Sequence, residues 1–363
     1  MKVEKTIQAK IVYPTKIKQR LLEEEYENLQ QLLHGEKAEL YSANKQQAKR
    51  FYRKIKPNKE YPLSIRKDLL KVEQRNTKIV QYWARIPVKG RRGGVWVAIW
   101  PHRLIEPDMG ICESKLFKRN KDFYLHMVVQ KEVEPRTNCE GLLAVDLGIH
   151  NIAVTVNSKT NETHFYGRKL RAARGHYFHL RSRLPNRKAV KKVGNHEKRI
   201  VNHEPHKISK AIVQEANRTN LVIAMGKLKG LRKNRNGKGR RFNRRLNSFP
   251  YYKLSSYIEY KAKWLGIPIL ILSEAYTSQT CSICGGRGDR RNGLFKCCCG
   301  AELNADYNGA RNIMKRGLGL MSKLGATVSL PRTTPTDSLS PMMRVEAPCE
   351  SWWGSSHKLI AVR

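Results

Sequence analysis

Five of the eight cysteines fall within nineteen positions, at a spacing typical of a metal site. Cys281 and Cys284 form a CxxC pair in CSICGG, and KCCCG supplies Cys297, Cys298 and Cys299. The second group offers at most a CxC pair, so we expect Cys297 and Cys299 to complete the set, with Cys298 as the spare. Four thiolates in this pattern predict a tetrahedral structural Zn²⁺ site that is closed to substrate. Unliganded reduced thiols are the alternative.

Three carboxylates form a second candidate constellation. Asp146 ends the apolar run LLAVDLG, Glu274 follows the last apolar strand in ILSEAYTS, and Asp306 begins a helix in LNADYNGARN. Each has an ordinary interpretation, as a turn residue or a helix N-cap. In the element order described below, all three positions converge on one sheet edge. Together they could hold two Mg²⁺ ions about 4 Å apart, which is the chemistry of phosphodiester hydrolysis.

Other features of the sequence narrow the chemistry. Neither a serine or cysteine nucleophile motif nor a Gly-rich phosphate loop after a strand is present. Asn308 and Asn312 follow Asp306 on the same helix. They are either ordinary polar positions of that helix or residues that orient a ligand or phosphate.

The elements around the carboxylates follow a recognisable order. Three strands come first, then a basic helical stretch to about residue 218, a strand, an amphipathic helix, a strand, the cysteines and a last helix. The expected strands are LLAVDLG, IAVTVNS, THFYG, LVIAM and IPILIL. The two helices after the basic stretch are YYKLSSYIEYKAKWLG and NADYNGARNIMKR. The order βββ, α, β, α, β, α predicts an RNase H-like layer sandwich whose first strand lies centrally in the sheet. A doubly wound sheet is the competitor.

The N-terminal part has a different pattern. VEKTIQAKIVYP alternates like a strand, the next segment has helical spacing and ends at Gly35, and helical pattern continues to about residue 83. VWVAIW, ICESKLFKR and DFYLHMVVQKEVE then return to strands. We expect a β-domain of residues 1–13 and 86–135 with a helical insertion at 14–85. Residues 317–363, poor in charge, are expected to form a disordered tail.

The charge balance identifies the partner class. Lys and Arg number 71 and Asp and Glu 30, a net charge of +41, while hydrophobic residues make up 40% of 363. This excludes a disulfide-stapled miniprotein and a disordered basic tail, and favours a folded nucleic-acid-binding protein. Two basic blocks, residues 167–200 and 227–245, are expected to contact the phosphate backbone. The sequence has no signal-peptide h-region and no apolar run of about 18 residues, so we expect a cytoplasmic protein without a membrane partner.

Five further segments make the sequence resemble the transposon-encoded TnpB (OrfB) family, which is related to the type V CRISPR effectors. They are AVDLGIHNIAV, HKISKAIVQEA, KLKGLRKN with NSFPYYKLSSYIEYKA, AYTSQTCSICG and NADYNGARNI. The resemblance implies an α+β multidomain protein: the N-terminal β-domain would be a barrel-like wedge and the insertion a helical recognition domain. Residues 136–275 and 301–316 would be a RuvC nuclease, and 276–300 an inserted zinc ribbon. It further implies a guide RNA from the transposon end and a double-stranded DNA target beside a short motif.

One departure from the family pattern affects the predicted activity. The family's usual second carboxylate is a Glu after the strand LVIAMGKLKGL, where this chain has Ala224, Met225 and Gly226. Either Glu274 supplies the missing Mg²⁺ ligand or the nuclease is dead. We favour an Mg²⁺-dependent, RNA-guided DNA endonuclease that uses Asp146, Glu274 and Asp306. A nuclease-dead guided DNA-binding protein is the alternative, followed by a transposase or general nucleic-acid binder.

Overall fold

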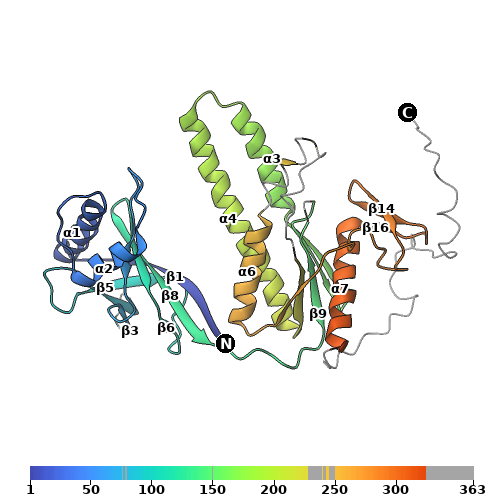
Figure 1. Ribbon diagram of the computed structural model, residues 1–363, viewed down its shortest axis with the longest axis horizontal. Coiled ribbons are helices and arrows are strands. Elements are labelled where there is room, and N and C mark those ends of the chain that lie inside the picture. The colour runs from blue at the N-terminus through green and yellow to red at the C-terminus, as the bar shows by residue number, and fades with distance from the viewer. Residues whose placement is uncertain are drawn as a thin grey trace. The chain divides into compact units, whose positions relative to one another are not determined.

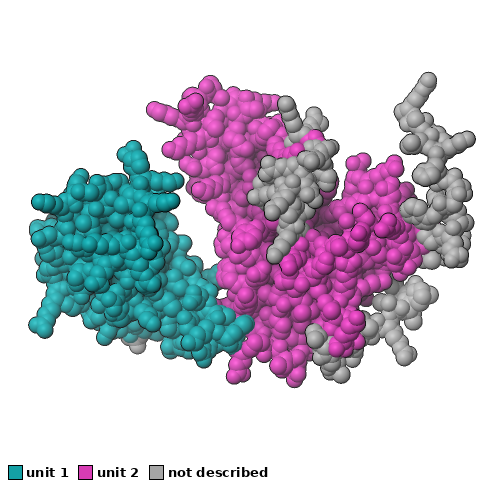
Figure 2. Space-filling view, in the orientation of Figure 1, with its two compact units in different colours: residues 1–133 teal, residues 134–363 magenta. Residues whose placement is uncertain are grey.

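The computed structural model describes residues 1–75, 77, 80–148, 150–227, 239, 243–244 and 250–323. The chain divides into two compact units, residues 1–133 and 134–363, which Figure 2 shows in different colours. Most of the basic block 227–245, and residues 324–363 of the expected tail, lie outside the described residues. Within the described ranges, no helix is long and apolar enough to cross a membrane.

The first unit is built on one eight-stranded sheet. Its strands are β1 (Lys2–Val12), β2 (Leu63–Ile65), β3 (Lys71–Gln74), β4 (Tyr82–Ile86), β5 (Val95–Pro101), β6 (Gly110–Ile111), β7 (Ser114–Arg119) and β8 (Asp122–Glu132). The order is β2-β7-β8-β1-β5-β4-β3, with β6 paired to β8, and every pair is antiparallel. Among the described residues no pairing joins β2 to β3, so barrel-like closure stays a prediction.

Two helices precede the second strand of this unit. Thr15 caps α1 (Lys16–Leu33), and α2 (Ser42–Phe51) follows. Tyr26 of α1 meets Phe123 of β8 edge to face, with ring centroids 5.8 Å apart, which packs the helix on the sheet.

The expectation of helix to about residue 83 was wrong. Strands β2, β3 and β4 occupy residues 63–65, 71–74 and 82–86. The apolar residues in this stretch also fit helical spacing, but they are buried by pairing with β7 and β5. Sheet pairing therefore overrides the local pattern.

The second unit contains the sheet order expected from the sequence. Its strands are β9 (Leu142–Asp146), β10 (Ala153–Asn157), β11 (Thr163–Tyr166), β12 (Val222–Gly226) and β13 (Ile269–Leu272). They run in the order β11-β10-β9-β12-β13, so the first strand lies centrally. The β9–β10 and β10–β11 pairs are antiparallel, whereas β12 is parallel to both β9 and β13. This order confirms the predicted RNase H-like arrangement over a doubly wound one.

Helices cover both faces of this sheet (Figure 1). They are α3 (Arg168–Ser182), α4 (Arg187–Arg218), α6 (Tyr251–Trp264) and α7 (Ala305–Lys323). Leu143 and Val145 of β9 pack toward α4 and α6, while Leu142 and Ala144 pack toward α7. Alternate residues of one strand thus supply two cores, as a fully buried strand requires. Helix α7 continues past residue 316, so the predicted tail boundary at 317 was wrong.

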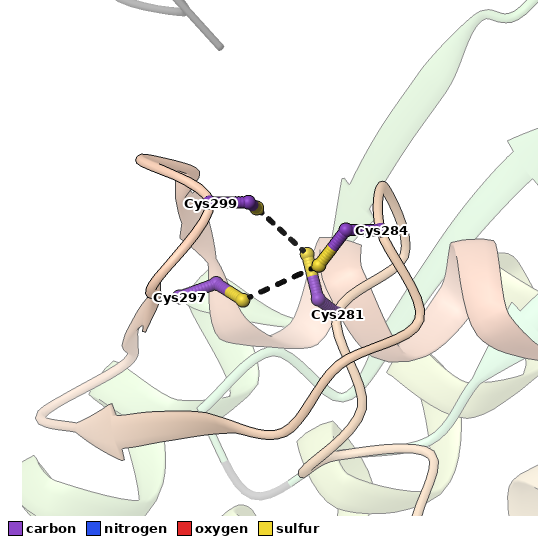
Figure 3. A group of neighbouring side chains, drawn as sticks. All are labelled: Cys281, Cys284, Cys297 and Cys299. Carbon is purple, nitrogen blue, oxygen red and sulfur yellow. Dashed lines mark hydrogen bonds between the residues drawn. The ribbon is translucent and has the colours of Figure 1, made fainter. Parts of the chain in front are cut away.

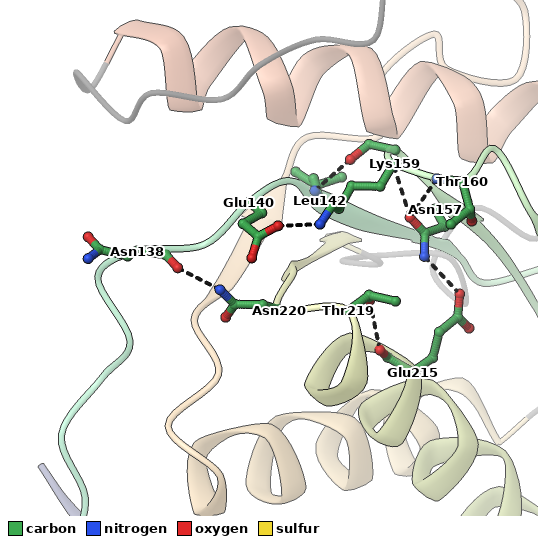
Figure 4. Close-up of polar contacts among 10 residues, drawn as sticks. Asn138, Glu140, Leu142, Asn157, Lys159, Thr160, Glu215, Thr219 and Asn220 are labelled. Carbon is green, nitrogen blue, oxygen red and sulfur yellow. Dashed lines mark hydrogen bonds and ion pairs between the residues drawn. The ribbon is translucent and has the colours of Figure 1, made fainter.

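Polar groups close the end of the sheet that lies away from Asp146 (Figure 4). The buried Asn157 side chain accepts hydrogen bonds from the backbone of Lys159 at 2.9 Å and Thr160 at 3.3 Å. Its amide lies 3.5 Å from the buried Glu215 carboxylate, whose pKa is raised by burial. These contacts pair backbone N–H groups in the turn after β10, and we assign them a structural role.

Candidate active site and metal centre

Asp146 lies at the carboxyl end of the central strand β9, against the first turns of α7. A methyl group at Gly309 of that helix would lie 2.8 Å from Asp146 Oδ2, so only glycine lets the helix come this close. Loss of hydration, with the negative charges of Glu274 and Asp306, raises the pKa of Asp146 to about 8, and Arg290 opposes the shift. The three carboxylates predicted from the sequence therefore share one electrostatic environment.

Asp306 is the most buried of the three, with 2% of its surface exposed. It does not cap α7, because Asn304 does so by accepting hydrogen bonds from the backbone of Asp306 at 3.0 Å and Tyr307 at 3.1 Å. Asp306 Oδ2 instead accepts from the Asn151 backbone at 3.2 Å and side chain at 3.0 Å. Its carboxylate faces the site and is free of the capping role that the sequence also allowed.

Glu274 follows β13 and reaches across the neighbouring strand β12. A methyl group at Gly226 would lie 1.8 Å from Glu274 Oε1 and 2.1 Å from its Cγ. The Glu274 side chain thus fills the space directly above Gly226, at the end of β12. Burial raises the pKa of Glu274 to about 7, and its buried Oε1 has no hydrogen-bond partner.

These features fit a hard divalent cation. Glu274 has a buried carboxylate oxygen without a hydrogen-bond partner, and burial raises the pKa of both Asp146 and Glu274, so a bound cation would stabilise their charged forms. Among the described residues, the group of His, Cys, Asp or Glu side chains whose ligand atoms all lie within 4.8 Å of one another consists of four cysteines, so the three carboxylates are spaced more widely than that. Oxygen donors of this kind are the preferred ligands of Mg²⁺.

Arg290 is a site residue that the sequence analysis missed. It lies on β14 (Gly288–Arg291) and its guanidinium donates to Asp306 Oδ1 at 2.7 Å. In the sequence it is one basic residue within GRGDRR, in a hairpin without a distinguishing motif. Only the tertiary fold brings it to the carboxylates.

The four predicted zinc ligands come together beside this site (Figure 3). The Sγ atoms of Cys281, Cys284, Cys297 and Cys299 all lie within 4.8 Å of one another. The Sγ separations are 3.8 Å for Cys281–Cys299 and 3.5 Å for Cys284–Cys297. Zn–S bonds of about 2.3 Å in a tetrahedron place sulfurs about 3.8 Å apart. The donor set therefore fits Zn²⁺, and it contains Cys297 and Cys299 rather than Cys298.

A small three-stranded sheet, whose middle strand ends at Cys297, packs with these cysteines. It consists of β14, β15 (Leu294–Cys297) and β16 (Glu302–Asn304) in the order β14-β15-β16. Its core is Phe295 with the cysteines and Ala305, the first residue of α7. Because this core is so small, we expect metal binding to supply much of the folding energy of the ribbon.

A family model and two relatives match parts of this chain. Residues 251–313 match the family model "Cas12f1-like, TNB domain". The chain is 32% identical over 203 residues to TnpB-like protein MJ0751 of Methanocaldococcus jannaschii, covering 52% of this chain and 72% of that protein. It is 30% identical over 259 residues to the CRISPR-associated endodeoxyribonuclease Cas12f2 of a Micrarchaeota archaeon, covering 64% of this chain but only 47% of that relative.

Two of the solved structures that the chain is similar to are described as complexes. One is described as a Cas12f1-sgRNA-target DNA complex, at 17% identity and a TM-score of 0.42, covering 87% of this chain and 100% of that one. Another is described as a CRISPR-Cas12f ternary complex, at 16% identity and a TM-score of 0.37, covering 74% and 67%.

Proposed function

Because the chain belongs to the TnpB family, which is related to the type V CRISPR effectors, we propose that it is an RNA-guided DNA endonuclease of a mobile element. Its second unit would be the RuvC nuclease with an inserted zinc ribbon, and its first unit the wedge and recognition part. Double-stranded DNA beside a short target-adjacent motif would be the substrate. Relatives whose names specify endodeoxyribonuclease or RNA-guided DNA endonuclease activity support this proposal.

The position of Glu274 above Gly226 is the observation that carries the proposal. In the sequence, no carboxylate directly follows β12, where the family usually has a Glu, and Glu274 would take the place of that residue. Glu274 comes from the adjacent strand, yet its side chain fills the space at the end of β12. Glu274 would thus be the third carboxylate beside Asp146 and Asp306, which an active metal-dependent nuclease requires.

The residues divide the catalytic work as follows. Asp146, Glu274 and Asp306 would hold two Mg²⁺ ions, which when bound activate water and stabilise the leaving oxygen. Asn151 fixes the orientation of the Asp306 carboxylate through two hydrogen bonds. Arg290 balances the charge of Asp306, and we propose that its guanidinium, which is 35% exposed, also contacts a DNA phosphate.

A basic helical hairpin supports the nucleic-acid partner. Residues 167–200, which form α3 and the first part of α4, carry twelve Lys or Arg and Glu197 as the one acidic residue. Glu197 is buried and ion-paired with Arg174 at 3.5 Å and with Arg181. The acidic charge is thus used internally, and the exposed surface of the hairpin is positive. We expect it to bind the phosphate backbone of RNA or DNA.

The sheet of the first unit also combines basic side chains with aromatic rings. The Arg75 guanidinium lies 4.5 Å from the Trp96 ring centre and 5.8 Å from that of Trp83. Arg119 lies 5.1 Å from the centre of Tyr124. Rings interleaved with cations are typical of surfaces that stack nucleic-acid bases beside a phosphate chain. This supports a role for the first unit in holding the guide RNA or the target.

Cleavage of a plasmid library with randomised flanks tests the proposal. The full chain, purified with its co-expressed RNA, is incubated with a guide-matched target in Mg²⁺ or in EDTA. We expect guide-dependent cuts in Mg²⁺ only, and sequencing the products reads out the target-adjacent motif. Retention of matched DNA without any cut would refute the nuclease and support a guided DNA-binding protein. Binding without guide or sequence preference would support a general nucleic-acid binder.

A further inference from the structure

Two asparagines on α7 join the segment of the zinc ligand Cys281 to the segment that carries Glu274. Asn308 and Asn312 are almost fully buried, with 0% and 6% of their surface exposed. Their side chains bond to backbone atoms of residues 277–282. Four hydrogen bonds thus attach α7 to this segment.

Asn308 holds the two neighbours of a zinc ligand. Its Oδ1 accepts from the Ser282 backbone at 2.8 Å, and its Nδ2 donates to the Thr280 carbonyl at 2.8 Å. Cys281 lies between those two residues. The position of the Cys281 thiol is therefore fixed relative to α7, which also carries Asp306.

Asn312 holds the turn that begins at Glu274. Its Nδ2 donates to the Thr277 carbonyl at 2.8 Å and the Thr280 carbonyl at 2.7 Å. Thr277 in turn donates to the Glu274 carbonyl, from its backbone at 3.2 Å and its hydroxyl at 2.9 Å. Because Glu274 precedes Cys281 by only seven residues, one short segment contains a carboxylate ligand and a thiolate ligand.

The ribbon also fixes the start of α7. Strand β16 runs directly into the helix, Ala305 belongs to the ribbon core, and the Ala305 backbone donates to the Gly293 carbonyl at 2.8 Å. Asp306 is the next residue, and Arg290 of the ribbon contacts it. The ribbon thus contacts Asp306 directly, and Glu274 shortly precedes the ribbon in the sequence.

We propose that Asn308 and Asn312 are positioning residues that couple the zinc site to the nuclease site, so that Zn²⁺ at the cysteines strengthens divalent-cation binding at the carboxylates. The inference rests on the two metal sites of the proposed function. Because the second carboxylate is Glu274, which lies on the same short segment as Cys281, this coupling is a property of the present chain. Thermodynamic reciprocity requires that a cation at the carboxylates also slow the loss of zinc.

Calcium titration of the full RNA-free chain tests the coupling without any cleavage assay. Ca²⁺ takes oxygen ligands, so calorimetry reports the carboxylate site, and Asp306→Asn identifies the heat that belongs to it. We expect removal of zinc to weaken Ca²⁺ binding about tenfold, within the usual range of coupling between sites. A chromogenic chelator should also extract zinc about tenfold more slowly when Ca²⁺ is bound.

Asparagine variants separate coupling from simple folding. Asn308→Ala and Asn312→Ala, still loaded with zinc, should bind Ca²⁺ about tenfold more weakly than wild type, and zinc removal should then change little. Asn186→Ala is the matched control, because it removes an asparagine-to-backbone bond of 2.8 Å at the start of α4. It should behave like wild type in both measurements.

Equal Ca²⁺ affinity with and without zinc, or wild-type affinity in both asparagine variants, would overturn the inference. If zinc removal unfolds the second unit, as circular dichroism would show, the zinc-loaded variants decide the question. A chain that shows the coupling but no guided cleavage would keep this inference and reject the proposed function. Guided cleavage with independent metal sites would do the reverse.

Discussion

Replacement of Gly226 by alanine should disable the nuclease although residue 226 supplies no ligand. The added Cβ would lie 1.8 Å from Glu274 Oε1 and 2.3 Å from its Cδ, far inside any tolerated contact. Either the Glu274 carboxylate leaves the site or the strands separate. Overpacking of this kind costs about 1–3 kcal/mol of stability, and each kcal/mol lowers Tm by about 2–4 °C in a unit of this size. Cleavage should fall to the level of Glu274→Ala.

A double-mutant cycle isolates the cause. Removing the side chain in Glu274→Ala relieves the overlap, so Gly226→Ala should cost little stability in that background, giving a coupling of about 1–3 kcal/mol. Gly319→Ala on α7 is the control, because a methyl group there meets nothing within 4 Å. It should leave cleavage unchanged and stabilise the helix by up to about 1 kcal/mol. Full activity of Gly226→Ala, or additive losses in the double variant, would refute the proposed position of Glu274.

Three further predictions concern the metals and their neighbours. The pKa of Asp146 is raised from 3.8 to about 8, so the metal-free chain should lose stability as pH rises between these values. Melting curves in EDTA should show this loss of stability. Addition of Mg²⁺, or the substitution Asp146→Asn, should reduce the loss. Cys281→Ser should abolish zinc binding while Cys298→Ser retains it, as metal analysis of the purified variants would show. Arg290→Gln leaves the buried Asp306 without its cation, so Tm should fall in EDTA and recover in Mg²⁺, and an equal loss in both would contradict this role.

The sequence was sufficient to predict the strand order of the sheet that positions Asp146. The apolar runs around Leu143 and Ile223 are short, continuous and flanked by turn residues, which is typical of strands buried on both faces. Their order along the chain then predicted a central first strand, and the pairing of β9 with β10 and β12 agrees. Local signals sufficed because these runs are continuously apolar and are bounded by turn residues.

Other parts depend on contacts between distant segments. Strands β2 and β3 have three and four residues, and pairing with β7 and β4 rather than local preference makes them strands. Likewise, nothing near Gly226 in sequence indicates that Glu274 fills the space above it. The pairing of β12 with β13 brings Gly226 and Glu274 together, and the missing side chain of the glycine provides the space that the Glu274 side chain occupies. Local patterns cannot report such relationships between neighbouring strands.

Single-turnover cleavage by the Glu274→Ala variant tests the central claim most directly. The RNA-loaded chain is mixed with matched DNA in Mg²⁺, with Glu302→Ala as control for an exposed ribbon carboxylate that pairs with Lys296. Loss of a metal ligand should cost more than the roughly 10–100-fold lost when an outer hydrogen-bond partner of a ligand is removed. We predict this loss for Glu274→Ala, with DNA binding retained, and none for Glu302→Ala. Cleavage by Glu274→Ala at the wild-type rate would contradict the assignment of Glu274 as the third carboxylate of the site.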